Sequence, residues 1–267
     1  MKGGNIHLDY PSVGATENLI MAAVLTEGIT EIRNAAKEPE ITDLQNFINS
    51  MGGKISGAGT STINIQGVET LSDCEYTPIP DRIIGGTYLI ACAICGGKIR
   101  VTNFQSEHLY ALIAKLRESG CEFDIYNNYI DIECKQRPVT AQIIETLPYP
   151  GFPTDLQAPM TALQTVSDGT CMIIENMFET RFKHCPELIK MGANITVRDR
   201  MAIVRGVNQL QGAEVSAMDL RGGAALVLAG LAAKGTTVIN NINHIDRGYF
   251  SIEEKFKHLG GEIERSA

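Results

Sequence analysis

Residues Asp219–Asn241, DLRGGAALVLAGLAAKGTTVINN, contain one copy of a pattern that the chain repeats, and the fold can be inferred from this pattern. Ala224–Leu231 is apolar on nearly every side, which is typical of a helix that is buried all round. Gly235 follows as a left-handed helix-ending residue, and Thr236–Asn241 is rich in the β-branched residues of strands. The stretch therefore predicts a buried helix, opened by an acidic cap and followed directly by a strand.

The same order of features occurs four times along the chain. Each copy has a polar cap, an apolar first helix that ends at a glycine, a strand that ends at an asparagine, and an amphipathic second helix that ends at another glycine. The two glycines lie about 24 residues apart in every copy. The positions are Ser12, Asp81, Asp155 and Asp219 for the caps, Gly28, Gly97, Gly169 and Gly235 for the first glycines, Asn34, Asn103, Asn176 and Asn241 for the asparagines, and Gly52, Gly120, Gly192 and Gly260 for the second glycines.

Each copy is interpreted as a βαβαββ repeat, with the first helices inside and the sheets outside. The chain then holds four repeats, the last one incomplete, and Asn5–Asp9 is interpreted as the closing strand of a repeat that precedes them. Gln136–Pro150, with three prolines, is interpreted as a long connector. We place a domain boundary in Leu71–Pro80, which predicts domains over residues 1–75 and 76–267. Burial in such a fold needs neighbouring repeats, so Leu19, Ile20, Val24 and Leu25 of the first helix are expected to be more exposed than their apolar character suggests.

Composition excludes several classes of protein. The net charge of -8 is opposite to the basic surplus of a nucleic-acid binder, and no apolar run approaches the length of a membrane span. The default expectation is a cytoplasmic protein that contacts neither nucleic acid nor membrane. Seven scattered cysteines argue against a disulfide framework. Cys92 and Cys95 form a C-x-x-C pair inside an apolar run, so these two cysteines are expected to be small buried side chains.

The loops between strands and helices are the expected place for chemistry, because they gather on one rim where helix N-termini attract anions. Arg181, Arg221 and Arg247 fall in these loops, and each could hold a phosphate or carboxylate with its bidentate guanidinium. Ordinary surface arginines are the alternative. Asp155 read alone is a helix N-cap. No two histidines have metal-ligand spacing, so we expect no metal and no cofactor.

Six short motifs follow one another along nearly the whole chain: Pro11–Thr16 (PSVGAT), Pro80–Ile83 (PDRI), Phe152–Ala158 (FPTDLQA), Phe178–Phe182 (FETRF), Asp219–Arg221 (DLR) and His244–Tyr249 (HIDRGY). In this set and order the chain resembles the UDP-N-acetylglucosamine enolpyruvyl transferases, also called 1-carboxyvinyltransferases. The related shikimate-phosphate transferases share the repeat but do not look like this at the third and fourth motifs.

The resemblance implies an inside-out α/β barrel of the enolpyruvyl transferase type, with six repeats in two globules and the active site between them. It implies that enolpyruvyl passes from phosphoenolpyruvate to the 3-hydroxyl of UDP-N-acetylglucosamine through a tetrahedral intermediate, and that phosphate is released. This reaction is the first committed step of bacterial peptidoglycan synthesis, and it serves cell-wall biogenesis, cell shape and cell division.

The resemblance also implies roles for particular residues. Asp155 would contact the reacting hydroxyl as its base, and Met177 would contact the nucleotide-sugar. Phosphoenolpyruvate binding or cleft closure would involve Arg181, Arg221 and Arg247. The UDP-sugar site would be lined by Tyr10, Pro11, Ser12, Val13 and Gly14.

The resemblance covers only the C-terminal three-fifths of the family's chain. None of the seven cysteines matches the family's loop that bears the general-acid cysteine, so this chain is expected to be inactive alone. Two alternatives are a non-catalytic module that binds sugar nucleotides or anions, and one half of a split enzyme completed by an N-terminal chain.

Overall fold

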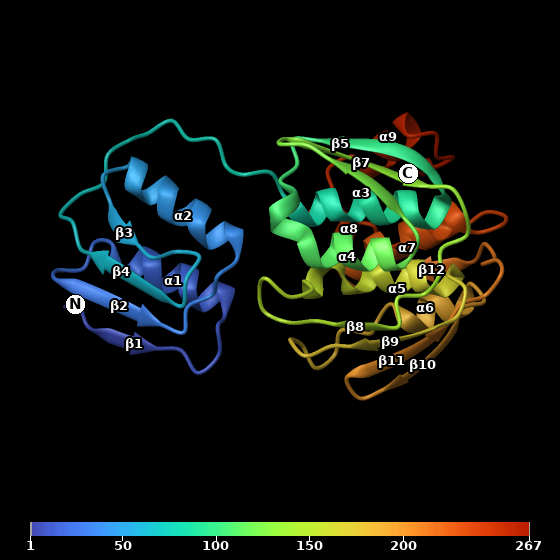
Figure 1. Ribbon diagram of the computed structural model, residues 1–267, viewed down its shortest axis with the longest axis horizontal. Helices are drawn as coiled ribbons and strands as arrows, with labels where there is room; N and C mark the ends of the chain where they lie inside the picture. The colour runs from blue at the N-terminus through green and yellow to red at the C-terminus, as the bar shows by residue number, and fades with distance from the viewer. Residues whose placement is uncertain (1, 267) are drawn as a thin grey trace. The chain divides into compact units, whose positions relative to one another are not determined.

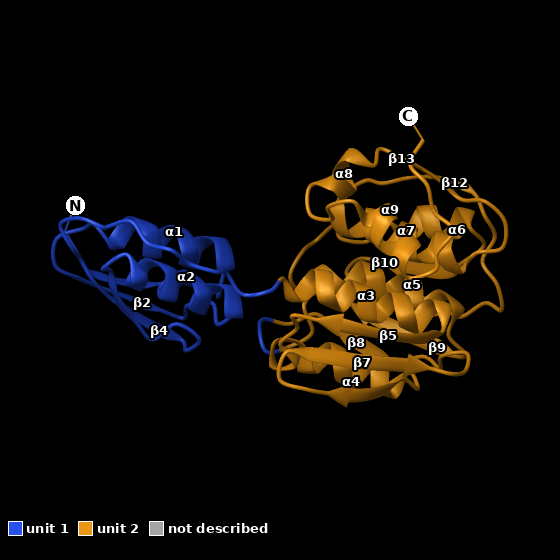
Figure 2. Ribbon diagram, turned by 90° about the horizontal axis from the view of Figure 1, so that it is seen from above, with its two compact units in different colours: residues 1–80, 148–150 blue, residues 81–147, 151–267 orange. Residues whose placement is uncertain are grey.

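The computed structural model describes residues 2–266, which form two compact units (Figure 2). Unit 1 contains the chain up to Pro80 together with Pro148–Pro150, and unit 2 contains Asp81–Leu147 and the chain from Gly151 onward. Within the described residues, no helix combines the length and the apolar character that a membrane span needs.

Unit 1 is a single βαβαββ repeat. Its sheet has the strand order β1-β2-β4-β3, in which β1 runs parallel to β2 and the other pairs are antiparallel. The two helices cover one face of this sheet (Figure 2), and apolar side chains from both layers form its core. The elements are β1 (Asn5–His7), α1 (Val13–Ala23), β2 (Ile29–Arg33), α2 (Pro39–Ser50), β3 (Lys54–Ser56) and β4 (Thr62–Gln66).

Unit 2 contains the other three repeats. The second repeat consists of α3 (Arg82–Cys95), β5 (Gly97–Thr102), a 3₁₀ turn η1 (Ser106–Leu109), α4 (Tyr110–Glu118), β6 (Glu122–Ile125) and β7 (Tyr129–Cys134). The third consists of β8 (Ile143–Glu145), a 3₁₀ turn η2 (Thr154–Leu156), α5 (Gln157–Val166), β9 (Thr170–Ile174), α6 (Cys185–Lys190), β10 (Asn194–Arg198) and β11 (Met201–Arg205). The fourth consists of β12 (Glu214–Ser216), α7 (Leu220–Ala232), β13 (Val238–Asn240), α8 (Asn243–Asp246) and α9 (Ile252–His258).

The first helices α3, α5 and α7 pack against one another at the centre of unit 2 (Figure 1). Their residues are buried almost throughout, as the apolar composition of the stretch around Ala224 predicts. The sheets β5-β7-β6, β8-β9-β11-β10 and β12-β13 lie outside them. The inside-out arrangement predicted from the sequence is confirmed.

The backbone conformation repeats at the same positions as the sequence pattern. All eight glycines that end the first and second helices have positive φ, between 88° and 116°, a region in which other residues are strained. Three of the four strand-ending asparagines, Asn34, Asn103 and Asn241, also have positive φ; Asn176 does not. The glycine spacing therefore reports real helix ends.

Two sequence interpretations of strands are wrong. Asn5–Asp9 does not close an earlier repeat, because β1 pairs parallel with β2 as β8 does with β9 and β12 with β13, so it opens the first repeat. Gln136–Pro150 is more than a connector, because it contains β8. Both opening strands are only three residues long, too short for an alternating pattern to be recognised.

The exposure predicted for the first helix is wrong for two of its four residues. Ile20 and Val24 are buried, with 0% and 3% of their surface exposed, because α1 packs against β2, β4 and α2 inside unit 1. Leu19 is half-buried, and Leu25 is 57% exposed. A single repeat thus buries much of its first helix with its own sheet.

The two cysteines of the C-x-x-C pair have different surroundings. Cys92 is buried as predicted, but Cys95 is exposed. Cys95 is the last residue of α3, where the helix leaves the packed centre of unit 2. The apolar run before it gave no sign of that change.

Candidate functional site

Asp155 is the one predicted helix cap that does not cap a helix. Ser12 Oγ accepts a hydrogen bond from the backbone N–H of Ala15, and the carboxylates of Asp81 and Asp219 accept from backbone N–H groups of their own first turns. Asp155 lies in the 3₁₀ turn η2 before α5, and no capping bond from its side chain is present in the described residues. Its carboxylate is directed to other partners.

Those partners are two arginines from different repeats. Arg181, in the loop between β9 and α6, donates from Nη2 to Asp155 Oδ1 at 2.5 Å. Arg221, in the first turn of α7, donates to Oδ2 from Nη2 at 2.9 Å and from Nε at 3.2 Å. The structure therefore brings three of the predicted site residues into one cluster, at the rim where strand-to-helix loops meet.

The cluster carries excess positive charge. Burial alone would raise the pKa of the Asp155 carboxyl, but the charges of Arg221 and Arg181 outweigh it and hold that pKa below its usual value. Asp155 is thus ionised at neutral pH between two cations. The guanidinium side chains are only 15% and 18% exposed, so an anion that reached them would meet weakly screened charge.

Arg221 is held from its other side by a buried hydroxyl pair. Its Nη1 donates to Tyr249 Oη at 3.3 Å, and Tyr249 Oη lies 2.9 Å from Thr87 Oγ1 on α3. Tyr249 is 2% exposed, and its ring lies 5.7 Å below the guanidinium carbon. Through these contacts the central helices α3 and α7 fix the direction of Arg221.

Glu175 supports the Arg181 side of the cluster. Its carboxylate is fully buried at the end of β9 and accepts hydrogen bonds from the hydroxyls of Thr146 and Thr154, each at 2.9 Å. It also accepts from the backbone N–H groups of Met177 and Phe178 at 2.9 and 3.1 Å. One side chain thus joins the turn that bears Asp155 to the loop that bears Arg181, and these hydrogen bonds satisfy a buried polar group.

Two further side chains line the loop of Arg181. The guanidinium of Arg181 lies 4.7 Å from the ring centre of Phe178, a residue that is 52% exposed. His184 is 2% exposed, and burial lowers the pKa of its imidazole to about 4, with a smaller effect from Arg181. The imidazole is therefore neutral at physiological pH and adds no third cation beside the arginine.

Two further predicted site residues, Arg247 and Met177, belong to unit 2. Arg247 is exposed at the C-terminal end of α8, and within residues 2–266 its side chain has no ion pair. Met177 is half-buried and reaches the network through its backbone. Tyr10, Pro11, Ser12, Val13 and Gly14 lie in unit 1 at the start of α1, where Ser12 caps the helix and Gly14 is exposed.

Sequence reasoning missed Thr87, Glu175 and the role of Tyr249. Tyr249 stood inside a recognised motif, but nothing local shows that its hydroxyl reaches a threonine 162 residues away. Glu175 did leave a signal, because a carboxylate directly after the apolar strand β9 is unusual. Among residues 2–266, no group of three or more His, Cys, Asp or Glu side chains is arranged to hold a metal ion.

Comparison with known proteins gives a consistent result. The model of the family EPSP synthase (3-phosphoshikimate 1-carboxyvinyltransferase) matches residues 1–256. A protein of Caldanaerobacter subterraneus subsp. tengcongensis, named UDP-N-acetylglucosamine 1-carboxyvinyltransferase 2, is 56% identical over 99% of this chain and 64% of its own. This chain therefore spans about 64% of that relative's length.

Solved structures agree on the fold. The enolpyruvyl transferase NikO from Streptomyces tendae matches with a TM-score of 0.87 and 26% identity, over 97% of this chain and 64% of NikO. EPSP synthase from Acinetobacter baumannii matches with a TM-score of 0.73 and 19% identity, over 100% of this chain and 64% of its own. The repeat architecture of unit 1 and unit 2 is the one these transferases have.

Proposed function

The chain belongs to the EPSP synthase family, and we propose that it forms part of an enzyme that transfers enolpyruvyl from phosphoenolpyruvate to the 3-hydroxyl of UDP-N-acetylglucosamine. Phosphate is the second product. The observation that carries this proposal is the Asp155–Arg181–Arg221 cluster, which combines an ionised carboxylate with two largely buried guanidiniums. The names of the similar relatives support the choice of acceptor sugar.

The two arginines fit a small substrate with a phosphate and a carboxylate. Each guanidinium presents parallel N–H donors that match either group in a bidentate manner. Arg181 and Arg221 approach opposite oxygens of Asp155, so a bound dianion would lie beside both without displacing the tyrosine contact of Arg221. Phosphoenolpyruvate has the charge and size that this arrangement favours.

Asp155 is proposed as the base for the sugar hydroxyl. While its carboxylate is paired with two cations it is a weak base, because both charges stabilise the ionised form. A bound anionic substrate draws the guanidiniums toward itself, which raises the pKa of Asp155 and makes it a better proton acceptor. The base is thereby activated when the second substrate is present.

The reaction is written as an addition followed by an elimination. The sugar oxygen bonds to C2 of phosphoenolpyruvate as Asp155 takes the hydroxyl proton, and C3 becomes a methyl group by taking a proton from a general acid in the rest of the enzyme. The C2–O bond to phosphate then breaks while C3 returns a proton to the conjugate base of that acid, which leaves the enolpyruvyl ether and free phosphate. Positive charge from Arg181 and Arg221 stabilises the anionic intermediate and the leaving phosphate.

Residues outside the cluster take substrate-binding roles in this proposal. Tyr10 to Gly14 contribute to the UDP-sugar site, Met177 contacts the nucleotide-sugar, and Arg247 joins when substrate is bound. Residues 1–75 would then be the last repeat of one globule and residues 76–267 the body of the other. The product would enter peptidoglycan synthesis and so serve the cell wall.

The first test is phosphate release by the purified chain with both substrates. Release that requires phosphoenolpyruvate and UDP-N-acetylglucosamine together, and that is lost in Asp155→Ala, supports a transferase. Binding of the sugar nucleotide without release at any enzyme concentration is expected both of an incomplete enzyme and of a non-catalytic module, and a chimera separates these two.

A chimeric enzyme tests the proposal without requiring this chain to be active alone. The matched part of the Caldanaerobacter relative is replaced by this chain, and phosphate release is compared with that of the unaltered relative. We expect the chimera to be active and Asp155→Ala within it to lower kcat by roughly 10³-fold. An inactive chimera beside an active relative would contradict the proposal, provided that circular dichroism shows it folded.

A further inference from the structure

The hydroxyl groups of Tyr249 and Thr87 can each be assigned a hydrogen-bond direction. Burial raises the pKa of the Tyr249 phenol, although Arg221 opposes this, so the phenol is neutral and has one hydrogen. A guanidinium only donates, so Tyr249 Oη accepts from Arg221 Nη1 and directs its own hydrogen to Thr87 Oγ1, 2.9 Å away. Thr87 Oγ1 in turn donates to Ile83 O at 2.8 Å. A one-way chain of hydrogen bonds therefore runs from Arg221 to a backbone carbonyl of α3.

The carbonyl at the end of this chain belongs to a capped and buried helix turn. Ile83 is in the first turn of α3, where Asp81 Oδ1 accepts from the N–H groups of Ile83 and Ile84 at 2.8 and 3.0 Å. Thr87 lies one turn further along the same face and is 1% exposed. The hydrogen bonds that hold Arg221 thus end on a regular helix and not on a loop.

Helix α3 also packs against the turn that bears Asp155. Leu156, the next residue along that turn, is fully buried, and its side chain lies directly on Gly86: a Cβ at Gly86 would be 2.7 Å from Leu156 Cδ1. Gly86 is the neighbour of Thr87 in the sequence. One short stretch of α3 therefore supports the carboxylate of the cluster on one side and, through the tyrosine hydroxyl, a guanidinium on the other.

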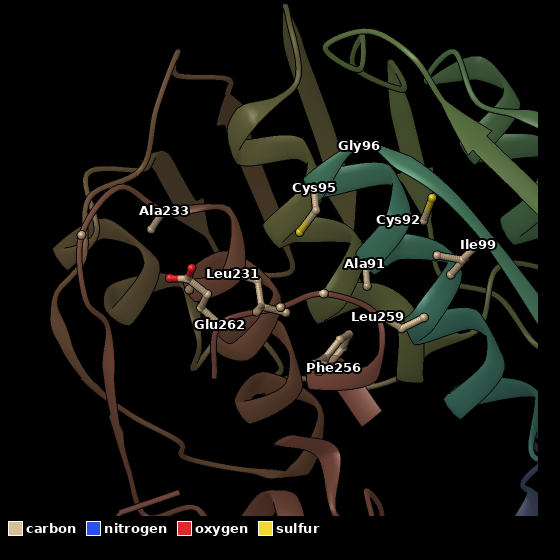
Figure 3. Close-up of a pocket in the computed structure, with 14 residues that line it drawn as sticks. Ala91, Cys92, Cys95, Gly96, Ile99, Leu231, Ala233, Phe256, Leu259 and Glu262 are labelled. Atoms are coloured by element: carbon tan, nitrogen blue, oxygen red, sulfur yellow. The ribbon is translucent and has the colours of Figure 1, made fainter. Parts of the chain in front are cut away.

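The hydroxyl pair is separate from the cavity of unit 2. That cavity has a volume of about 510 Å³, and the residues of α3 that line it are Ala91, Cys92 and Cys95, which follow Thr87 toward the end of the helix (Figure 3). Neither Thr87 nor Tyr249 is among its lining residues. Water in the cavity therefore has no contact with the pair, and removal of one hydroxyl should leave the other group unpaired.

The tyrosine bond also decides which edge of the guanidinium faces Asp155. Arg221 donates from Nη1 to Tyr249 Oη, while Nε and Nη2 donate to Asp155 Oδ2 at 3.2 and 2.9 Å. A guanidinium is planar and rigid, so it cannot turn without losing bonds on both sides at once. Among the described contacts, one N–H on each terminal nitrogen of Arg221 remains for a bound anion.

We propose that Tyr249 and Thr87 are positioning residues: they hold Arg221 in the orientation that presents its remaining N–H groups to phosphoenolpyruvate. Both residues act through Arg221 and have no substrate contact of their own. This inference rests on the proposed function. It extends that function by giving a role to α3, a helix that contributes no residue to the cluster itself.

Four variants separate the hydroxyl groups from the packing of the fold. Tyr249→Phe keeps the ring, 5.7 Å from the guanidinium carbon, and removes only the hydroxyl. Thr87→Val removes the second hydroxyl with little change of shape, and Thr87→Ser keeps it. Thr161→Val is the matched control, because Thr161 is a fully buried residue of α5 whose hydroxyl donates to Gln157 O at 2.9 Å, one turn back, as that of Thr87 does to Ile83 O.

Proton exchange at Arg221 Nε tests the positioning in this chain itself and needs no transferase activity. The Nε–H signal is observed by nuclear magnetic resonance with ¹⁵N-labelled arginine, and it is assigned by its loss in Arg221→Lys. We expect Tyr249→Phe and Thr87→Val to speed its exchange with water by about 10-fold, because the guanidinium loses its support. Thr87→Ser and Thr161→Val should stay within about 2-fold of the unaltered chain.

Kinetics of the chimeric enzyme test the consequence for the reaction. We expect Tyr249→Phe and Thr87→Val to lower kcat/KM for phosphoenolpyruvate by roughly 10-fold, and KM for the sugar nucleotide to change by less than about 2-fold. The acid limb of the kcat/KM pH profile should move to higher pH. Arg221 lowers the pKa of Asp155, and a loosely held Arg221 would lower it less.

The outcomes for this inference and for the proposed function can be told apart. Equal exchange at Arg221 in Tyr249→Phe and the unaltered chain would overturn the positioning role, as would unaltered kinetics of Tyr249→Phe in an active chimera. Equal losses in Thr87→Val and Thr161→Val, both folded by circular dichroism, would also overturn it, because they would show a general effect of a buried valine. An inactive parent chimera contradicts the proposed function, and the exchange rates then decide the positioning of Arg221.

Discussion

Asp155 and Asp219 occupy equivalent places in the third and fourth repeats, and they use their carboxylates in opposite ways. Asp219 Oδ1 accepts a hydrogen bond from Gly222 N at 2.7 Å and caps α7. Asp155 accepts only charged donors in the described structure, and one of them, Arg221, belongs to the helix that Asp219 caps. A position that the fold uses for helix capping is therefore used for an ion-pair cluster in one repeat.

Arg221→Lys tests whether the fork shape of the guanidinium matters or only its charge. Lysine keeps the charge but cannot bond to Asp155, Tyr249 and a substrate oxygen together. In the chimeric transferase we expect kcat/KM to fall by roughly 10- to 100-fold, measured as phosphate release. Arg200→Lys, at a surface arginine that pairs with Glu179, is the control and should change it less than about 2-fold.

Glu175→Gln should weaken the fold through the site. The amide that replaces one carboxylate oxygen is a donor, and it would face groups that already donate, the N–H of Met177 or the hydroxyl of Thr154. We expect the free energy of unfolding to fall by about 2 kcal/mol, measured by denaturant titration. Glu179→Gln, whose side chain is 82% exposed, should change it by less than about 0.5 kcal/mol. Equal effects would show that the buried network contributes little.

His184 gives a pH dependence whose sign is set by burial. Its pKa falls from 6.5 to about 4 in the folded chain, so the unfolded chain binds a proton that the folded chain does not. Above pH 6.5 the imidazole is neutral in both states and does not lower the free energy of unfolding. As the pH falls from 6.5 toward 4, the free energy of unfolding decreases by up to about 3 kcal/mol. His184→Gln should flatten the loss of stability between these pH values. Replacement of the exposed His258 by Gln should leave the slope as it is.

Gly223 marks the closest approach between α7 and its neighbours. A Cβ there would lie 2.6 Å from Cγ1 of Ile245 and 3.1 Å from Cβ of Ala217, so Gly223→Ala should cost about 1–3 kcal/mol of unfolding free energy. Gly14→Ala is the matched change in a first helix, because a Cβ at Gly14 meets nothing within 4 Å. It should be neutral or stabilising by up to about 1 kcal/mol, since alanine is the better helix former. The same thermal or denaturant unfolding experiment checks both.

Local signals in the sequence predicted the repeat and the central helices. The physical cause of such features is local in the sequence: a glycine with positive φ, such as Gly28, and an all-apolar helix, such as α7, are each recognised from a few neighbouring residues. The resemblance drawn from six motifs agrees with the family match. Local sequence could not distinguish Asp155 from a helix-capping aspartate, because its two arginine partners lie 26 and 66 residues away along the chain. Glu175 and Thr87 were missed for the same reason, since their contacts exist only after the repeats have packed.

The parallel pairing of each opening strand has a consequence for how fast the protein folds. The hairpin of β10 and β11 closes over two residues, at Asp199 and Arg200, and can form within microseconds. The pairing of β8 with β9 must wait until the intervening helix α5 has been placed, because the paired residues Ile143 and Met172 are far apart along the chain. Loop closure of that kind slows the search for the native topology. Refolding should therefore show early hairpins followed by a slower step in which the opening strands dock, and the apolar edges of β9 and β2 are open to aggregation in the interval.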